Sequence, residues 1–591
     1  MPQDAFHIRR LAEELNRTLT GGKVNRVSQA DKDEITLIIY TKNGTLKLIL
    51  NTNASFARVT VQDTEKPPLL VPPSFCMLLR KHLSGGEILS VKQVGNERII
   101  AVTFLCFNDF SGGEKILYAE LMGKYSNLIL TEKGVILGAL KSTPLENSSG
   151  RALFSGARYA LPAPQEKVPP TDMLAIENRW TEFVSLAPDC GKNDGGSGEK
   201  TAYDGNEKTN CGDDFFYGEE AAKFLFGNVA GIALPTARHI LEKAKERGVS
   251  QKDIPAFFVR FYEEEKTDAY LSKGKGGYDD FFAFPIDGGE KAGSLNDAEA
   301  KYYVSRSENR AFGEKKTKLA AVTNGKIKKC EKNLADTLRR LAEAENAETN
   351  RVKGELVTAN IYKIKKGDSL LIAENWYDGG KEEKITLDKT LSPAANAQKY
   401  FKTYAKEKRT TEALLPRKEK EEAELSYFRS VLTFVSAAEN ADDLKETEEE
   451  LRALGLLPQE KAKKKKTEEA VPFRKYAVDG FTILAGRNNV SNDRLLKYLG
   501  AEDLWLHTQK YHSAHVGILS DGKHIPENVL LAASEICAHF SEAKNGEKIA
   551  VDYTMRKYVK KPKKAAAGFV FYTDYKTLYV AGNAHEKERT E

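Results

Sequence analysis

Basic and aromatic residues are interleaved near the C-terminus. Between Val551 and Lys564 the chain carries six basic residues against one acid, and two tyrosines, Tyr553 and Tyr558, lie among them. Basic side chains neutralise backbone phosphates, and tyrosine rings stack on exposed bases. A solvated loop is the alternative for a charge run alone, but the combination favours RNA binding. The candidates are Arg556, Lys557, Lys560, Lys561 and Lys563.

Amide and histidine side chains precede this stretch in the same region. Asparagine amides can bond to sugars, phosphates or base edges. Three histidines lie within nine residues of one another, from His507 to His515. Imidazole often ligates metals, but no cysteine or well-spaced acid completes a set, so packing or RNA contact is favoured over a metal site. The further RNA-binding candidates are Arg487, Asn488, Asn489, Asn492, Asp493, Trp505, His507 and His515.

A second group of candidates lies in the N-terminal part. Glu97 and Arg98 follow Gly95-Asn96, which predicts a turn entering a strand. An arginine there can clamp a phosphate while the carboxylate orients it or accepts from a base amine. The alternative is a surface ion pair of little energetic weight. A glycine in the run 120–127 lets backbone pass close to a partner. The residues singled out are Asp4, Glu97, Arg98, Glu120, Gly123, Lys124 and Asn127.

A glycine-bearing turn between two apolar helices is predicted at GNVAGIALPTARHI, from Gly227 to Ile240. This arrangement resembles a helix-hairpin-helix, in which turn amides at the second helix's N-terminus can bind phosphate. An ordinary helical hairpin fits equally well, because a single G-x-x-x-G is a weak signal. The candidate phosphate-binding residues are Gly227 and Gly231.

Length and composition limit the remaining possibilities. The 591 residues suggest about four domains. A content of 41% apolar and 30% charged residues is typical of globular domains with long polar helices. No apolar run approaches the roughly 18 residues of a membrane span, and the N-terminus lacks a secretory core, so a cytoplasmic location is expected. Six cysteines without a C-x-x-C argue against a zinc ribbon or a disulfide scaffold.

The elements that position these residues can be predicted from periodicity. Helices are expected at Ile8–Leu15 and Phe75–Leu83, and a hairpin around Asn43-Gly44. Two long polar helical stretches, from about Glu314 to Arg351 and, with breaks, from about Pro393 to Leu454, predict an antiparallel coiled-coil arm. In the C-terminal domain a helix is expected from Asp493, and the last strands, 569–573 and 577–581, are expected to pair with each other.

The predicted fold class is multidomain α+β. The expected domains are a mixed α/β domain at 1–170, a helix-hairpin-helix domain at 171–275 with a flexible insertion at 189–213, an arm at 276–456 with a middle cap at 354–391, a charged linker at 457–470, and a mixed α/β RNA-binding domain at 471–591.

Motifs along nearly the whole chain resemble the NFACT family of ribosome-associated quality-control proteins, which includes RqcH in bacteria and NEMF in animals. Some bacterial members also carry the label of fibronectin-binding proteins. The matching stretches include FCMLLRKHLSGGEI (75–88), ELMGKYSNLIL (120–130), LSPAANAQKYFKTYAKEK (391–408), GRNNVSND (486–493) and VDYTMRKYVKKPKKAAAGFVFY (551–572).

The resemblance implies an N-terminal domain with a glycosylase-like fold, and an adaptor function. Family members bind a large ribosomal subunit obstructed by peptidyl-tRNA, contact rRNA and recruit charged tRNA, which is alanyl-tRNA in bacteria. They direct untemplated C-terminal tailing that marks the stalled chain for degradation. The ribosome makes the peptide bonds, so the resemblance implies no catalytic residue, no cofactor and no metal. A small RNA-binding helper protein on the ribosome is a further expected partner, and no membrane partner is expected. A folded-back arm predicts a monomer off the ribosome, whereas a dimerising coiled coil predicts a dimer.

Two departures from the family pattern bear on this expectation. Asp4 matches the family's early aspartate, and Glu97-Arg98 matches its Asp-Arg pair, which is tied to tRNA engagement. Glutamate here keeps the charge but reaches one methylene further. The family's Pro-Gly-Ser-His run corresponds to residues 512–515, where only His515 is retained.

Two rival functions rest on single features. Formamidopyrimidine-type DNA glycosylases use an N-terminal proline amine as nucleophile, and this chain begins Met1-Pro2. Against this, Gln3 replaces the acid that follows that proline, and the cysteines of their zinc finger are missing. The other rival is a fibronectin-binding surface adhesin, which no signal peptide or sorting segment supports.

Overall fold

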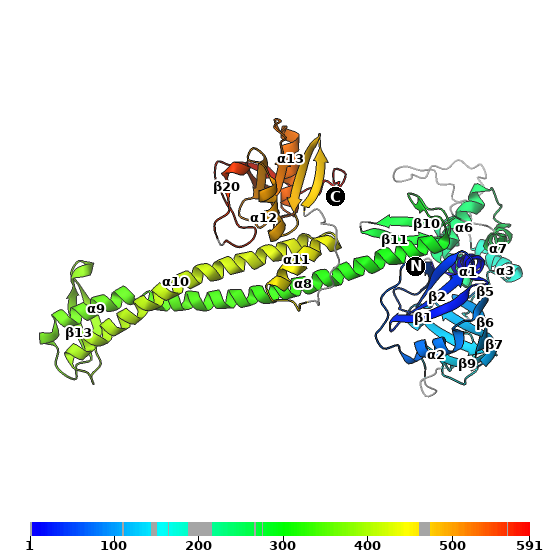
Figure 1. The fold of residues 1–591 in the computed structure, drawn as a ribbon, viewed down its shortest axis with the longest axis horizontal. Helices are drawn as coiled ribbons and strands as arrows, with labels where there is room; N and C mark the ends of the chain where they lie inside the picture. The colour runs from blue at the N-terminus through cyan, green and yellow to red at the C-terminus, as the bar shows by residue number, and fades with distance from the viewer. Residues whose placement is uncertain are drawn as a thin grey trace, which may run out of the picture. The chain divides into compact units, whose positions relative to one another are not determined.

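The computed structural model describes residues 3–108, 111–143, 151–163, 165–186, 215–264, 268–274, 276–459, 473–563 and 565–590. Pro2, the predicted insertion at 189–213 and most of the predicted linker at 457–470 lie outside these residues. The described residues fold as two compact units, one up to Asn309 and one from Arg310 onward. The chain is a multidomain mixed α/β protein with long helices, as the sequence predicts (Figure 1).

The first unit is built on an antiparallel sheet in the order β4-β3-β2-β1-β5-β6-β7-β8-β9. Its strands alternate apolar residues toward a buried core, which α1 (Ala5–Leu19) and α2 (Ser74–Leu83) help to form. The strands are β1 (Lys23–Asp31), β2 (Glu34–Thr41), β3 (Gly44–Asn51), β4 (Arg58–Gln62), β5 (Glu87–Gln93), β6 (Ile99–Asn108), β7 (Ser111–Glu120), β8 (Asn127–Glu132) and β9 (Val135–Ala139).

Helices and a small sheet complete the first unit. Their apolar side chains join the same core as the large sheet. The helices are α3 (Met173–Ser185), α5 (Glu219–Asn228), α6 (Leu234–Glu246) and α7 (Ile254–Glu264), and the strands are β10 (Tyr270–Gly274), β11 (Gly277–Phe282) and β12 (Glu290–Lys291), in the order β11-β10-β12. No helix in the described part of the chain is long and apolar enough to cross a membrane.

The first long helix differs from the prediction at both ends, since it ends at Ala344 and a separate helix, α9 (Ala347–Ala359), covers the predicted end at Arg351. α8 runs from Leu295 to Ala344, so the predicted start near Glu314 was wrong. The carboxylate of Glu14, in α1, accepts from the backbone N–H groups of Leu295 (3.0 Å) and Asn296 (3.4 Å). A side chain remote in sequence therefore satisfies the first amides of this helix, which no local cap could reveal.

The arm of the second unit consists of α8 from Arg310 on, α9 (Ala347–Ala359), a hairpin of β13 (Leu370–Asn375) and β14 (Lys381–Thr386), α10 (Pro393–Ala437) and α11 (Ala441–Ala453). α8 and α10 run antiparallel and share an apolar cluster that includes Leu319, Ile327 and Phe428. Ion pairs between Lys326 and Glu424 (2.7 Å) and between Glu331 and Arg429 (3.0 Å) flank it.

The C-terminal domain is a sheet in the order β15-β16-β18-β17-β19-β22, with α12 (Asn489–Tyr498) and α13 (Glu527–His539) packed on it. Its strands are β15 (Phe473–Val478), β16 (Phe481–Gly486), β17 (Leu504–Thr508), β18 (Val516–Leu519), β19 (Ile549–Met555) and β22 (Lys576–Val580), beside a short ladder of β20 (Val559–Lys560) and β21 (Phe571–Tyr572).

Two predictions for this domain were wrong. The last strands do not pair with each other, because β22 takes the edge of β19 while β21 pairs with β20. The buried Asp552 carboxylate fixes both, since it accepts from Tyr572 Oη (2.8 Å) and Thr577 Oγ1 (2.6 Å). The helix expected from Asp493 begins four residues earlier, because Asn488 caps it.

Candidate nucleic-acid interface

Three segments of the first unit converge at Gly231, in the turn between α5 and α6. The Ala5 amide donates to the Gly231 carbonyl (2.7 Å). A Cβ added to Gly231 would lie 2.6 Å from Ala5 Cβ and 2.7 Å from the Asn96 carbonyl oxygen, and its φ is +70°. Only glycine fits this approach. The residue therefore holds the helical hairpin against the start of α1 and against the β5–β6 turn that carries Glu97 and Arg98.

Asp4 joins two of these segments, the start of α1 and the start of α6, through its buried carboxylate. One oxygen accepts from the His7 amide (2.9 Å) at the start of α1. The other accepts from the Ala233 amide (2.8 Å) and from Thr236 Oγ1 (2.6 Å) at the start of α6. The amide at the second helix's N-terminus is thus bound by Asp4, where the hairpin hypothesis placed a phosphate. Gly227 lies inside α5 and not in the turn.

Glu97 and Arg98 lie half-buried on the β5–β6 turn. The Arg98 carbonyl accepts from the Leu121 amide (2.8 Å), which brings this turn beside the 3₁₀ turn at Gly123–Tyr125. Lys124 is exposed there, with its ammonium 4.9 Å from the centre of the Tyr125 ring. Within the described residues, the Arg98 guanidinium has no hydrogen-bond or ion-pair partner. This edge therefore offers a cation and an exposed aromatic ring to a partner.

Glu120 and Asn127 lie opposite each other on β7 and β8, and both are buried. The Glu120 carboxylate forms a two-pronged pair with Arg151 and accepts from Tyr159 Oη (2.9 Å). The Asn127 side chain bonds to both backbone groups of Lys141. The side chains of both predicted residues are therefore used in contacts within the domain. The pairing of Glu120 with Arg151 could not be predicted, because 31 residues separate the two in the chain.

The basic stretch of the second unit divides into bound and exposed cations. The Arg556 guanidinium donates to the backbone carbonyls of Leu496 (2.6 Å) and Val559 (2.9 Å). Lys557 pairs with Glu502 (3.1 Å), and Lys561 pairs with Asp493. Lys560 and Lys563 are exposed, and no other described residue binds their ammonium groups. Lys557 and Lys561 are exposed as well, but each is paired with a carboxylate, so Lys560 and Lys563 are the exposed lysines of this stretch that no described residue binds.

The predicted amides mainly build α12 and its contacts. Asn488 is the N-cap of α12, and its side chain accepts from the Ser491 amide (2.7 Å). The Asn489 amide donates to Ser430 Oγ on α10 (2.9 Å). The Asn492 oxygen accepts from the His515 amide (3.0 Å), which ties α12 to the segment before β18. The local capping box is readable from sequence, whereas the contact with α10 is not.

The Trp505 ring packs between two predicted histidines. Its indole is buried, with the His507 ring stacked at 5.8 Å and the His515 ring edge-on at 5.1 Å between ring centres. Burial, together with neighbouring imidazoles, lowers the pKa of His507 to about 4 and that of His515 well below its usual value. Both rings are therefore neutral at pH 7. Among the described residues, no group of three or more metal-ligating side chains is present.

Comparison with known proteins decides the family. The family model described as NFACT N-terminal and middle domains matches residues 4–193 and 212–470, and the one described as NFACT protein RNA binding domain matches 471–572. The chain belongs to the NFACT family. Two similar relatives are the proteins named Rqc2 homolog RqcH from Bacillus subtilis (strain 168) and Streptococcus suis (strain 05ZYH33). The first is 30% identical over 97% of each chain, and the second is 29% identical over 98% of each.

A solved structure of part of a relative was also found. It is the C-terminal part of a fibronectin/fibrinogen-binding protein from Streptococcus suis. It is 28% identical, covers 47% of this chain and 97% of its own, and has a TM-score of 0.37.

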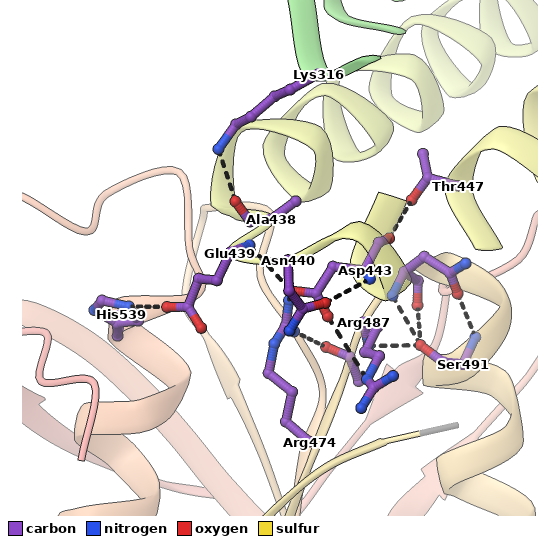
Figure 2. Close-up of polar contacts among 12 residues, drawn as sticks. Lys316, Ala438, Glu439, Asn440, Asp443, Thr447, Arg474, Arg487, Ser491 and His539 are labelled. Atoms are coloured by element: carbon purple, nitrogen blue, oxygen red, sulfur yellow. Dashed lines mark hydrogen bonds and ion pairs between the residues drawn. The ribbon is translucent and has the colours of Figure 1, made fainter. Parts of the chain in front are cut away.

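In this NFACT chain, the RNA-binding domain docks on the arm through buried charges (Figure 2). Asp443, at the start of α11, accepts from Arg474 Nη2 (2.8 Å), and its other oxygen lies 3.6 Å from Arg487 Nε. Arg474 also donates to the Gly486 carbonyl (2.9 Å). Beside them, Glu439 binds His539 (3.1 Å) and Arg589. Arg487, which the sequence predicts to bind RNA, thus forms an ion pair with Asp443 within the protein.

Proposed function

We propose that this chain is a ribosome quality-control adaptor that directs C-terminal tailing of stalled chains. The observation that carries the proposal is the similarity to the Rqc2 homolog RqcH, which extends over 97% of both chains. A match that includes the arm and the RNA-binding domain favours this role over the glycosylase and adhesin hypotheses, which rest on single features.

The partners in this proposal are the large ribosomal subunit with its rRNA, the obstructing peptidyl-tRNA and a charged alanyl-tRNA. The first unit would engage tRNA through the edge that presents Arg98 and Lys124. The RNA-binding domain would contact RNA through Lys560 and Lys563, and the arm would span the subunit. Peptide bonds would form at the ribosome's own centre. The domain limits expected from sequence, at 170, 275, 456 and 470, remain part of the proposal.

The test is purification of the tagged protein from its native cell, followed by sequencing of the RNA that comes with it. We expect large-subunit rRNA together with one enriched tRNA species. Arg98→Ala should lose the tRNA and keep the subunit, because only the guanidinium at the edge is removed. Arg17→Ala is the control, since Arg17 is an exposed arginine of the same unit and, as for Arg98, no other described residue binds its side chain.

Two outcomes would contradict the proposal. If neither RNA exceeds a mock purification, the ribosomal role is wrong. If Arg98→Ala retains as much tRNA as Arg17→Ala, the edge does not engage tRNA. Glu97→Asp restores the family's usual residue and should retain the tRNA.

A further inference from the structure

A cavity of about 490 Å³ lies between α10 and the RNA-binding domain. Tyr427 and Ser430 of α10 form one wall. Asn489 and the two histidines His507 and His512 form the other, and the Ala565–Phe569 loop closes one side. Its volume falls within the range of roughly 300–1,000 Å³ that is usual for small-molecule sites. Of the contacts described above, the hydrogen bond from the Asn489 amide to Ser430 Oγ joins two of the lining residues across the cavity.

The loop that closes the cavity is held by fixed contacts. The Gly568 amide donates to Asp493 Oδ1 (3.1 Å), and a Cβ added to Gly568 would lie 2.6 Å from Asn489 Oδ1. Gly568 also has a φ of +79°, which favours glycine. Three alanines, 565–567, precede it and leave the loop backbone accessible at the cavity. The close packing at Gly568 therefore fixes the position of the loop on this side of the cavity.

The lining is mainly apolar, with uncharged polar groups set into it and no cation among the described residues. Hydroxyl, amide and imidazole groups provide both donors and acceptors. Burial lowers the pKa of His507 to about 4 and also lowers that of His512, so both imidazoles are neutral at pH 7. The only formal charge among the described lining residues is Glu422, which repels a phosphate. The chemistry thus suits a neutral, planar group with hydrogen-bonding edges.

The loop that lines the cavity follows the part of the chain where RNA binding is expected. The basic stretch that ends in Lys560 and Lys563 leads directly into the Ala565–Phe569 loop. Phe569 lines the cavity and is 49% exposed, and its ring centre is 5.2 Å from that of Phe571, which is 63% exposed. Cations that hold a backbone beside aromatic rings that stack bases are the recurring arrangement for unpaired RNA.

We infer that this cavity receives one unpaired nucleobase of RNA, with the RNA backbone running along the basic stretch outside it. The inference rests on the proposed function, because it names the ligand chemistry of the same RNA-binding domain. It adds that α10 supplies one wall of the base site. The arm and the RNA-binding domain would therefore both contact the bound base.

The test uses the full chain and two fluorescent probes of equal length and charge. One is a single-stranded oligoadenylate of ten nucleotides, and the other is a decamer of abasic spacers. The unmodified protein should bind the base-containing probe about tenfold more tightly, as expected for one stacked base. Binding is measured by fluorescence anisotropy at fixed salt, because phosphate contacts depend on ionic strength.

Two variants address the cavity from opposite sides. Ala423→Trp places a ring at the cavity from an exposed position of α10, and Phe569→Ala removes the exposed ring of the loop. Each should weaken binding of the base-containing probe about tenfold and leave the abasic probe unchanged. Leu415→Trp is the control for the first variant, since Leu415 is 48% exposed on the same helix and does not line the cavity.

The results separate this inference from the proposed function. Equal affinity for the two probes, or unchanged binding by both variants, would overturn the base site. If Ala423→Trp misfolds by circular dichroism, Phe569→Ala decides alone, because trimming an exposed ring leaves no internal cavity. Co-sedimentation with large subunits is measured in parallel. If the unmodified protein does not co-sediment with large subunits, the ribosomal role is refuted. If it co-sediments but binds the two probes equally, only the role of the cavity is refuted.

Discussion

Replacing Asp443 with alanine should loosen the contact between the RNA-binding domain and the arm. The ion pair with Arg474 is buried, with side chains 0% and 1% exposed. Breaking a buried pair by removing one partner typically costs about 3–5 kcal/mol, because the other charge stays buried and unpaired. Arg474 would keep its bond to the Gly486 carbonyl and its position 4.0 Å above the centre of the Phe540 ring. We therefore expect the lower end, about 3 kcal/mol.

Native-state hydrogen exchange followed by mass spectrometry reads this contact locally. A loss of about 3 kcal/mol is about two orders of magnitude in an opening equilibrium. Amides of α11 and of the β15–β16 hairpin should exchange faster by about that factor in Asp443→Ala. Asp442→Ala is the matched control, because Asp442 is the preceding residue on α11 and is exposed. Its exchange should stay within a factor of about three of the unmodified chain.

A double variant tests whether charge pairing is the cause. Arg474→Met keeps a long apolar side chain against Phe540 and removes the cation. The double variant Asp443→Ala/Arg474→Met removes both charges of the buried pair. Its loss of local stability should therefore be smaller than the sum of the losses in the two single variants. Exchange of Asp443→Ala that matches the control would refute the reasoning. So would strict additivity of the two substitutions.

The remaining predictions concern acid sensitivity and backbone fit. Burial alone would raise the pKa of Glu439, but its two basic partners hold that pKa at about 2, below the ordinary 4.5. The resulting stability is fully present above about pH 4.5 and is lost as pH falls toward 2, so Glu439→Gln should flatten this part of a plot of melting temperature against pH. Gly231→Ala should cost about 2 kcal/mol of unfolding free energy in a denaturant titration, from its clash with Ala5 and Asn96 and its positive φ. Gly248→Ala is the control for backbone strain alone, because Gly248 has a φ of +61° and no atom lies within 4 Å of an added Cβ. An equal loss of unfolding free energy in the two variants would show that the clash at Gly231 is unimportant.

Local elements were predictable because their signals lie in adjacent residues. The alternating apolar residues around Asn43-Gly44 gave the hairpin of β2 and β3, with Thr41 opposite Gly44. The apolar spacing of Phe75–Leu83 gave α2. Such patterns describe which face of an element is buried, and burial of that face is what stabilises the element.

Features that depend on remote partners were not predictable. The start of α8 depends on Glu14, and the pairing of β22 depends on Asp552, neither of which is near in sequence. The same limit applies to the candidate site. Asp4 was singled out, but its bonds to Ala233 and Thr236 needed the structure. Likewise, composition identified the basic stretch but could not show that Arg556 turns its guanidinium inward.

The most direct test of the central claim is the C-terminal sequence of stalled chains. A reporter translated from an mRNA without a stop codon is purified from native cells that contain or lack this protein, and its C-terminus is sequenced by mass spectrometry. The account predicts untemplated alanines only in cells that contain the protein, and none when it is replaced by Arg98→Ala. Identical reporter ends in the presence and absence of the protein would contradict it.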